Sequence, residues 1–237
     1  MPALKDKTVL IIGRGSGIAR SIALAVSQDG GGVIAAGLQP GDLADAYRGT
    51  DISIEQVDVT DESSVAALAG RIAKLDHVVS TASARARGGY ADLTAGLVAA
   101  SFSTKVTGAL LLAKHFAGNL PPDGSFLFMS GATALKPAPG VLAVAATNAA
   151  VDAITAGLAV ELAPIRVNAI APGTIDTGAY DALGDERKAA LFKARSATNP
   201  ARRIGTADDI AAAALAALTN GFLTGVSIPV DGGEHLV

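Results

Sequence analysis

Short apolar runs alternate along the chain with longer segments in which apolar residues recur every three or four positions. The runs predict strands at residues 8–12, 32–36, 52–57, 77–80, 125–129, 165–170 and 226–230. The longer segments predict helices from about residue 17, at 61–74 with Asp61 as the cap, and at 95–119, 141–163 and 208–218. Strands that are apolar throughout and alternate with helices form a parallel sheet covered on both faces. We therefore predict one doubly wound α/β domain over residues 1–237, with a polar link at 39–50 and an irregular polar stretch from 173 to 203.

The first predicted strand leads directly into a glycine-rich turn, Gly13-Arg14-Gly15-Ser16-Gly17-Ile18, at which a helix starts. Glycines in such a turn let the backbone approach a pyrophosphate closely, and the helix N-terminus supplies N–H groups and partial positive charge. Strand, glycine turn and helix together are typical of a Rossmann-type dinucleotide site. The alternative is an ordinary strand–helix turn that binds no ligand.

The carboxyl ends of the other predicted strands meet at the same edge of the sheet, where we expect the rest of the cofactor site. The residues expected there are Leu38, Asp58, Val59, Thr81, Ala82, Ser83, Pro172, Gly173, Ile175 and Thr177. Asp58 either accepts a hydrogen bond from an adenine amino group or is a plain turn aspartate. The second strand ends at Gly37-Leu38 without the carboxylate that commonly holds the ribose in an NAD site. We therefore expect NADP(H) rather than NAD(H), with Arg14 as a 2′-phosphate partner or a solvated turn residue.

These features and several later landmarks resemble the short-chain dehydrogenase/reductase family over nearly the whole chain. The later landmarks are Gly108, Arg166-Val167-Asn168, Pro172-Gly173, Thr177, Arg203-x-Gly205 and Val230-Asp231-Gly232-Gly233, while Ala19 replaces the usual last glycine of the nucleotide loop. The resemblance implies that Asp58 and Val59 contact adenine. It also implies that the helices at 95–119 and 141–163 pair across a two-fold axis, so we expect a homodimer or homotetramer.

The chain departs from the family at the residues that carry its chemistry. The family uses an Asn, a Ser, and a Tyr four residues before a Lys; Lys105, Gly131, Val144 and Asn148 stand at these positions. No Tyr-x-x-x-Lys occurs anywhere in the chain, so the family's proton relay is absent. We predict that Lys105 and Ser130 form the polar side of a catalytic site and that Asn148 holds a ribose hydroxyl. Burial lowers the pKa of a lysine, so Lys105 either donates a proton near neutral pH or only binds cofactor.

Three functions fit this sequence. The first is an NAD(P)(H)-dependent oxidoreductase for a small carbonyl or alcohol substrate with a non-standard proton donor; it is favoured because Pro172-Gly173 and Thr177 are kept. The second is an NADP(H)-binding sensor or partner subunit without turnover, and the third is a lyase or isomerase on the same fold. Thr147 and Tyr180 are further polar candidates near the substrate. Arg85 and Arg87 either steer an anionic substrate or are solvated loop charges.

Composition narrows the expected partners and location. A net charge of −3 without a basic face argues against nucleic acid, and the absence of cysteine excludes thiol chemistry. The three histidines, His77, His115 and His235, show no metal-ligand spacing. The apolar run at 141–164 is interrupted by polar residues, so it reads as a buried helix rather than a membrane span. The short charged start resembles neither a signal nor a transit peptide, and we expect a cytoplasmic protein.

Overall fold

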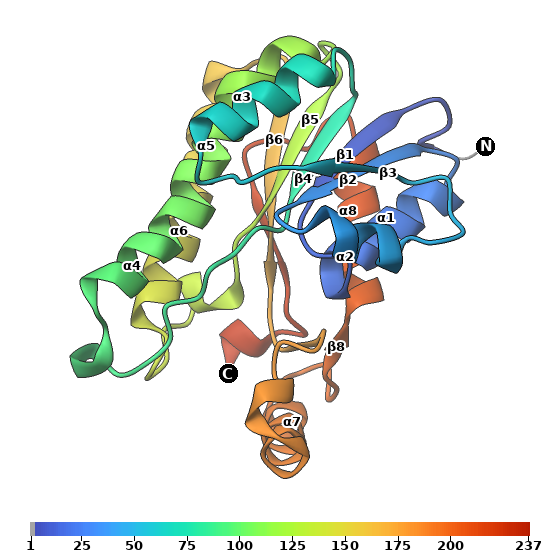
Figure 1. The fold of residues 1–237 in the computed structure, drawn as a ribbon. Helices are drawn as coiled ribbons and strands as arrows, with labels where there is room; N and C mark the ends of the chain where they lie inside the picture. The colour runs from blue at the N-terminus through green and yellow to red at the C-terminus, as the bar shows by residue number, and fades with distance from the viewer. Residues whose placement is uncertain (1–2) are drawn as a thin grey trace.

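The computed structural model describes residues 3–237 and confirms the predicted seven-stranded parallel sheet (Figure 1). Its strands are β1 (Thr8–Ile12), β2 (Gly32–Gly37), β3 (Ser53–Gln56), β4 (His77–Ser80), β5 (Ser125–Met129), β6 (Arg166–Pro172) and β9 (Ser227–Val230). They lie in the order β3-β2-β1-β4-β5-β6-β9, so the strand order reverses between β1 and β4. Ile12 pairs with Ala36 on one side and with Ser80 on the other, so these three strands end level with one another. A ligand crevice is expected at this reversal.

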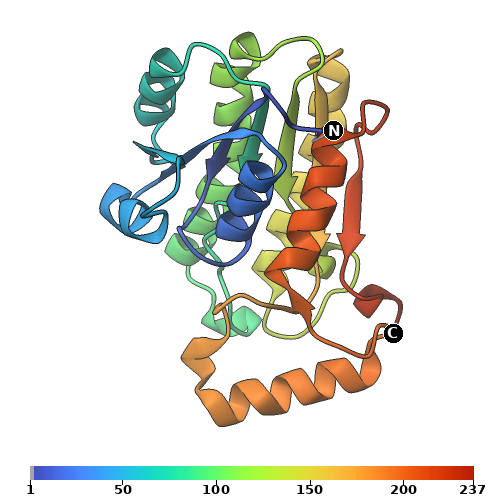
Figure 2. The same ribbon diagram turned by 90° about the vertical axis from the view of Figure 1, so that its right-hand side faces the viewer.

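Helices cover both faces of the sheet. One face carries α1 (Gly17–Gln28), α2 (Pro40–Ala46) and α8 (Ala207–Thr219), and the other carries α3 (Glu62–Arg71), α5 (Gly108–Phe116) and α6 (Leu142–Glu161). Helix α4 (Ala95–Phe102) continues through a π-helical turn, Ser103–Thr107, into α5. Helix α7 (Asp185–Thr198) lies beyond the edge at which the strands end (Figure 2).

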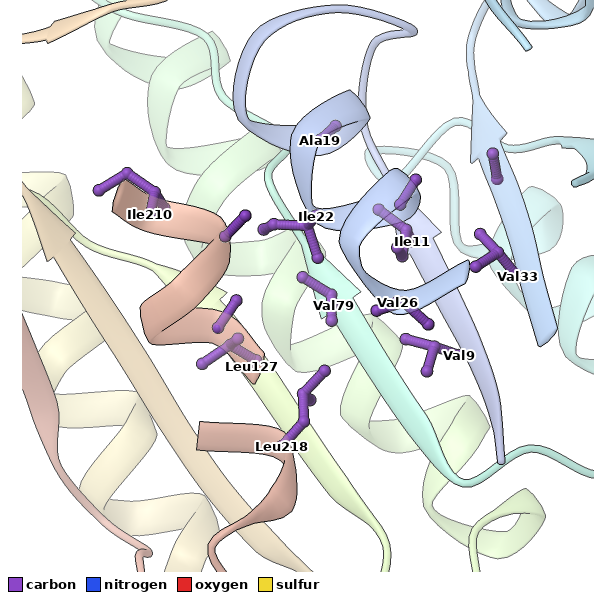
Figure 3. Close-up of a cluster of buried hydrophobic side chains, with 14 of the residues drawn as sticks. Val9, Ile11, Ala19, Ile22, Val26, Val33, Val79, Leu127, Ile210 and Leu218 are labelled. Carbon is purple, nitrogen blue, oxygen red and sulfur yellow. The ribbon is translucent and has the colours of Figure 1, made fainter. Parts of the chain in front are cut away.

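The alternation of side chains along each strand builds one core on each face of the sheet. Val9 and Ile11 belong to the core beneath α1 and α8; Figure 3 shows Ile22 of α1 next to Ile11, with Ile210 of α8 farther along the same core. The intervening Leu10 belongs to the second core, together with Phe116 of α5. Each fully buried side chain of this size contributes about 1.5–3 kcal/mol. The two cores therefore hold the strand ends, and the loops that follow them, on a rigid support.

Two stretches predicted as irregular contain helices. The link at 39–50 holds α2, which starts at Pro40 and has Asp42 in its first turn, both favourable at a helix N-terminus. The stretch up to residue 203 holds α7 and a two-residue strand, β7 (Ile175–Asp176), which pairs with β8 (Gly205–Thr206). No residue of α7 is buried, and its only large apolar residues are Leu191 and Phe192, so its apolar pattern is weak.

The other predicted elements are confirmed with small changes at their ends. Asp61 caps α3 as predicted and accepts a hydrogen bond from the Ser63 amide at 2.9 Å. Helix α3 ends at Arg71 rather than residue 74, and the Asn119 side chain donates to the carbonyls of Ala69 and Ile72 there. Strand β6 runs through Pro172 instead of ending before it.

The two long apolar helical segments are only partly buried. By length and composition alone, both Ala95–Asn119 and Leu142–Glu161 could cross a membrane, with 22% and 33% of their most apolar windows buried. In this fold both pack on the sheet or on each other. The sequence predicts a buried helix at 141–164, but only one face of α6 is buried. Its other face is exposed, with Leu142 58% and Val160 80% accessible.

The three histidines each contact one polar neighbour. His77 is buried at the start of β4, its Nδ1 lies 2.9 Å from the Ser125 hydroxyl, and burial lowers its pKa to about 4. His115 pairs with Glu62, and His235 with Asp231. Within residues 3–237, no group of three or more His, Asp or Glu side chains is arranged to hold a metal ion.

Candidate functional site

In the turn after β1, glycines stand where a side chain would collide with neighbouring residues. A Cβ on Gly13 would lie 2.1 Å from the Thr81 hydroxyl, which itself donates to the Ile12 carbonyl at 3.1 Å. Gly17 has a φ of +55°, and a Cβ there would lie 3.1 Å from Cβ of Thr177. Ser16, the N-cap of α1, has extended backbone, and its side chain makes no capping hydrogen bond. The first-turn N–H groups of α1 are therefore left for a ligand, as a pyrophosphate requires.

Three strand ends converge on this turn. A Cβ on Gly37, at the end of β2, would lie 2.6 Å from the Gly13 carbonyl oxygen. Leu38 follows and is 60% exposed. The backbone amide of Thr81, after β4, donates to the Ile12 carbonyl at 2.8 Å. Thr177 approaches from the loop after β6, so the predicted cofactor-binding segments lie at one edge of the sheet, as expected.

Asp58 and Val59 both make local contacts in the loop after β3. For Asp58, the sequence left two roles open, an adenine contact and a turn aspartate. Oδ1 of Asp58 accepts hydrogen bonds from the Thr60 amide at 2.8 Å and the Thr60 hydroxyl at 2.7 Å, so the turn role is present. The adenine contact stays a prediction for the other oxygen. Val59 is buried, and a Cβ on Gly108 would lie 3.2 Å from it. Glycine at 108 thus lets α5 pack closely on the loop after β3.

A second group of polar side chains lies where β5, α6 and the π-helical turn meet. Lys105 belongs to that turn, and such turns inside helices are frequent at functional sites. Its Nζ donates to the Ser130 carbonyl at 3.0 Å and to Oδ1 of Asn148. Nδ2 of Asn148 donates to the Thr133 hydroxyl at 2.7 Å. The structure thus brings together Lys105, Ser130 and Asn148, which the sequence had singled out separately.

Burial changes the chemistry of Lys105. The side chain is partly buried, and the desolvation of its charge is the main cause that lowers its pKa from 10.5 to about 7. The positive charge of Arg85 lowers the pKa further, whereas Asp152 raises it. Near neutral pH, Lys105 therefore exchanges readily between ammonium and amine, as a general acid or base must.

The loop after β4 carries two more basic residues toward the same edge. The Arg87 guanidinium lies over the ring of Tyr180, 5.5 Å from its centroid, and Tyr180 meets the Phe192 ring of α7 edge-on at 5.6 Å. The Gly88 amide donates to the Gly140 carbonyl at 3.0 Å, which ties this loop to the segment before α6. Sequence reasoning had no signal for these contacts because it did not predict α7.

A family model described as enoyl-(acyl carrier protein) reductase matches residues 12–235. The chain belongs to the short-chain dehydrogenase/reductase family. An uncharacterised oxidoreductase of Mycobacterium tuberculosis is 34% identical, with 97% of this chain and 92% of that protein covered. A short-chain dehydrogenase/reductase of an Acremonium species is 29% identical, over 98% of this chain and 96% of the relative.

Solved structures agree with this family assignment. A small-chain dehydrogenase in complex with NADPH is 33% identical and has a TM-score of 0.84, covering 98% of this chain and 99% of that one. The reductase/Diels-Alderase MalC of Malbranchea aurantiaca has a TM-score of 0.92 at 27% identity, covering 100% of this chain and 99% of that one. The predicted fold and the oxidoreductase family are thus confirmed.

The structure explains how this short-chain dehydrogenase/reductase accommodates its unusual residues. A Cβ on Gly131 would lie 2.5 Å from Nδ2 of Asn148, so a serine at 131 would collide with the asparagine. The Ser130 hydroxyl donates to the Asn148 backbone carbonyl at 3.1 Å, so Ser130 contributes to the site through its own carbonyl oxygen. The Thr147 hydroxyl is likewise bonded within α6, to the Val144 carbonyl at 3.0 Å.

Proposed function

We propose that the protein is an NADP(H)-dependent oxidoreductase that interconverts a small carbonyl compound and its alcohol, with Lys105 as the proton donor. The observation that carries the proposal is the placement of Lys105. Its amino group is held at the carboxyl edge of the sheet by two acceptors, and burial brings its pKa to about 7. The nicotinamide, when bound, supplies or accepts the hydride.

The hydrogen bonds of Lys105 suit it to a reversible proton transfer. An ammonium group has three N–H donors, and the Ser130 carbonyl and Asn148 Oδ1 accept two of them. In reduction, the carbonyl carbon gains the hydride and the carbonyl oxygen takes the third proton from Nζ, which leaves an alcohol and a neutral amine. The amine keeps both hydrogen bonds, so its position does not depend on its charge. Proton uptake from water then restores the ammonium.

The residues at the sheet edge fit a dinucleotide by their shape and polarity. The glycine turn and the uncapped start of α1 offer backbone N–H groups for the pyrophosphate. Asp58 and Val59 would border the adenine, and Thr81, Ala82 and Ser83 the middle of the molecule. Asn148 would hold a ribose hydroxyl, with Pro172, Gly173, Ile175 and Thr177 beside the nicotinamide.

The direct test is the oxidation of NADPH, followed by its absorbance, with a panel of aldehydes, ketones and quinones. Substrate-dependent loss of absorbance is expected with at least one class. The absence of the family's Tyr and Lys, with Val144 and Asn148 in their places, favours a nucleotide-binding protein without turnover as the second candidate. Tight NADPH binding with no turnover on any compound would favour that candidate.

Cofactor choice can be tested at Arg14 and Leu38. The residue at the end of β2 is an exposed leucine, so no carboxylate there repels a 2′-phosphate, and Arg14 is exposed in the adjacent turn. Loss of a charge-assisted hydrogen bond costs about 1.5–3 kcal/mol. We expect Arg14→Ala to weaken NADP⁺ binding about tenfold or more with little effect on NAD⁺, and Leu38→Asp to reverse the preference. Equal affinities for both cofactors, unchanged in Arg14→Ala, would contradict this.

A homodimer or homotetramer is the expected assembly. The exposed sides of α4 and α5 carry Leu97 (47% exposed) and Leu110 (44%), and α6 carries Leu142 and Val160. Apolar residues exposed together on neighbouring helices commonly mark a protein–protein interface. Light scattering at micromolar concentration should give a multiple of 23.5 kDa, and Val160→Glu should shift the protein toward monomer. A wild-type monomer at that concentration would refute the prediction.

A further inference from the structure

We propose that the substrate is an anion, a small carbonyl or alcohol compound whose carboxylate or phosphate is bound by Arg85 and Arg87. The assignment of a reaction rests on the function proposed above, whereas the anion site itself does not. Sequence alone left these two arginines as either substrate-steering or solvated loop charges. The absence of acidic partners in the described residues and the contact of Arg87 with Tyr180 support the first role.

The basic residues at this edge have no acidic partners. In the described part of the chain, none of Arg14, Arg85, Arg87 and Lys105 forms an ion pair with a carboxylate. Asp176 and Asp181, on the segment before α7, are both paired with Lys188. Beyond the effect of desolvation, the positive charges of Arg87 and Arg14 lower the pKa of Arg85, and the charge of Arg85 in turn lowers the pKa of Lys105. Like charges gathered without counter-ions are unfavourable, and a bound anion would relieve that repulsion.

The arginines lie in the loop after β4, beside the segments assigned to the cofactor. Their loop follows β4, next to the strand-order reversal, and Gly88 links it to Gly140, between β5 and α6. Arg87 is held against Tyr180, which belongs to the segment leading into α7. The cofactor's pyrophosphate is assigned to the glycine turn after β1 and its 2′-phosphate to the end of β2. Arg85 and Arg87 belong to neither of these segments, so they are available to a different anion.

The chemistry of the two side chains fits a carboxylate or phosphate. A guanidinium offers paired N–H donors that match two oxygens of either group. Arg85 and Arg87 are both exposed, so an incoming anion can reach them. Stacking on Tyr180 fixes Arg87 before the anion binds, which limits the entropy lost on binding.

Pairs of substrates that differ only in one anionic group show how much that group contributes to recognition. We would compare kcat/KM with NADPH for succinic semialdehyde against its methyl ester, and for dihydroxyacetone phosphate against dihydroxyacetone. The charged member of at least one pair should be preferred about tenfold or more, and which pair responds identifies carboxylate or phosphate. Arg85→Gln and Arg87→Gln should remove this preference mainly by raising KM. Arg71→Gln, which removes an equal charge paired with Glu55 elsewhere, should leave it intact.

Binding measurements keep this inference separate from the proposed reaction. The NADP⁺-loaded protein would be titrated by calorimetry with succinate and with inorganic phosphate, in wild type, Arg85→Gln and Arg71→Gln. Binding that only Arg85→Gln weakens, without turnover of any compound, would support the anion site and remove the oxidoreductase. Equal turnover of charged and neutral partners would overturn the anion site and leave the oxidoreductase. If Arg85→Gln loses as much affinity for NADP⁺ as for the anion, the arginine binds the cofactor, and this too would overturn the inference.

Discussion

Lys105→Met is expected to lower kcat for carbonyl reduction about 10²- to 10⁴-fold while the Kd for NADPH changes little, because a positioned general acid contributes roughly that factor. Methionine has a similar length and suits the partly buried position, so the fold should persist. Steady-state rates and a fluorescence titration of NADPH separate the two effects. If Lys105 only binds ribose, the variant should instead lose cofactor affinity and keep kcat. Turnover that survives with affinity intact would remove Lys105 from the mechanism.

The pH profile gives an independent test of the same group. Reduction needs the protonated form, and the pKa of Lys105 is about 7. The rate should therefore be level at lower pH and fall about tenfold per pH unit above that value, while alcohol oxidation should rise over the same range. Lys105→Arg keeps the positive charge at every accessible pH, so both profiles should lose this inflection. An inflection that is unchanged in Lys105→Arg would show that another group titrates.

The sequence predicts the sheet well because both faces of each strand are apolar. It misses α2 and α7 because α2 has only seven residues and α7 has no buried residue, so the apolar pattern is weak in both. The sequence does carry signals for the two helix starts: Pro40 for α2, and the adjacent acids Asp185 and Glu186 for α7. The glycine turn can be predicted from the sequence because its residues are adjacent in the chain. The contact of Arg87 with Tyr180 joins segments far apart in the chain, and no local pattern predicts it.

The residues at positions 105, 131 and 148 fit one another in the structure. A lysine at position 105 needs acceptors, and Asn148 supplies one through Oδ1 while the Ser130 carbonyl supplies another. Glycine at 131 leaves the room that the asparagine side chain fills. The sequence singles out four positions separately, and the structure brings three of them, Lys105, Gly131 and Asn148, into contact in one cluster. These hydrogen bonds satisfy the polar groups of the cluster, as any stable fold requires, so activity has to be tested through the Lys105 variants.

Ser16→Asp is expected to stabilise the cofactor-free protein yet weaken NADPH binding. Ser16 is the N-cap of α1 and makes no side-chain capping bond, so a carboxylate there can cap the helix and interact with its dipole. That interaction is worth about 0.3–1 kcal/mol and should raise Tm. The same carboxylate would lie against the pyrophosphate, and like charges about 5 Å apart repel by roughly 1–3 kcal/mol. The Kd for NADPH should therefore rise about ten- to a hundredfold.

This substitution tests the cofactor site more cleanly than a change at a glycine. A Cβ at Gly17 would approach Thr177, so a loss of binding there would not separate a blocked phosphate from a disturbed loop. Ser16→Asn is the matched control, since it has the size and capping ability of aspartate without the charge. It should bind NADPH like the wild type, measured by calorimetry at two salt concentrations, while the deficit of Ser16→Asp should shrink at the higher salt. If Ser16→Asp binds as tightly as Ser16→Asn, the pyrophosphate does not lie on this turn.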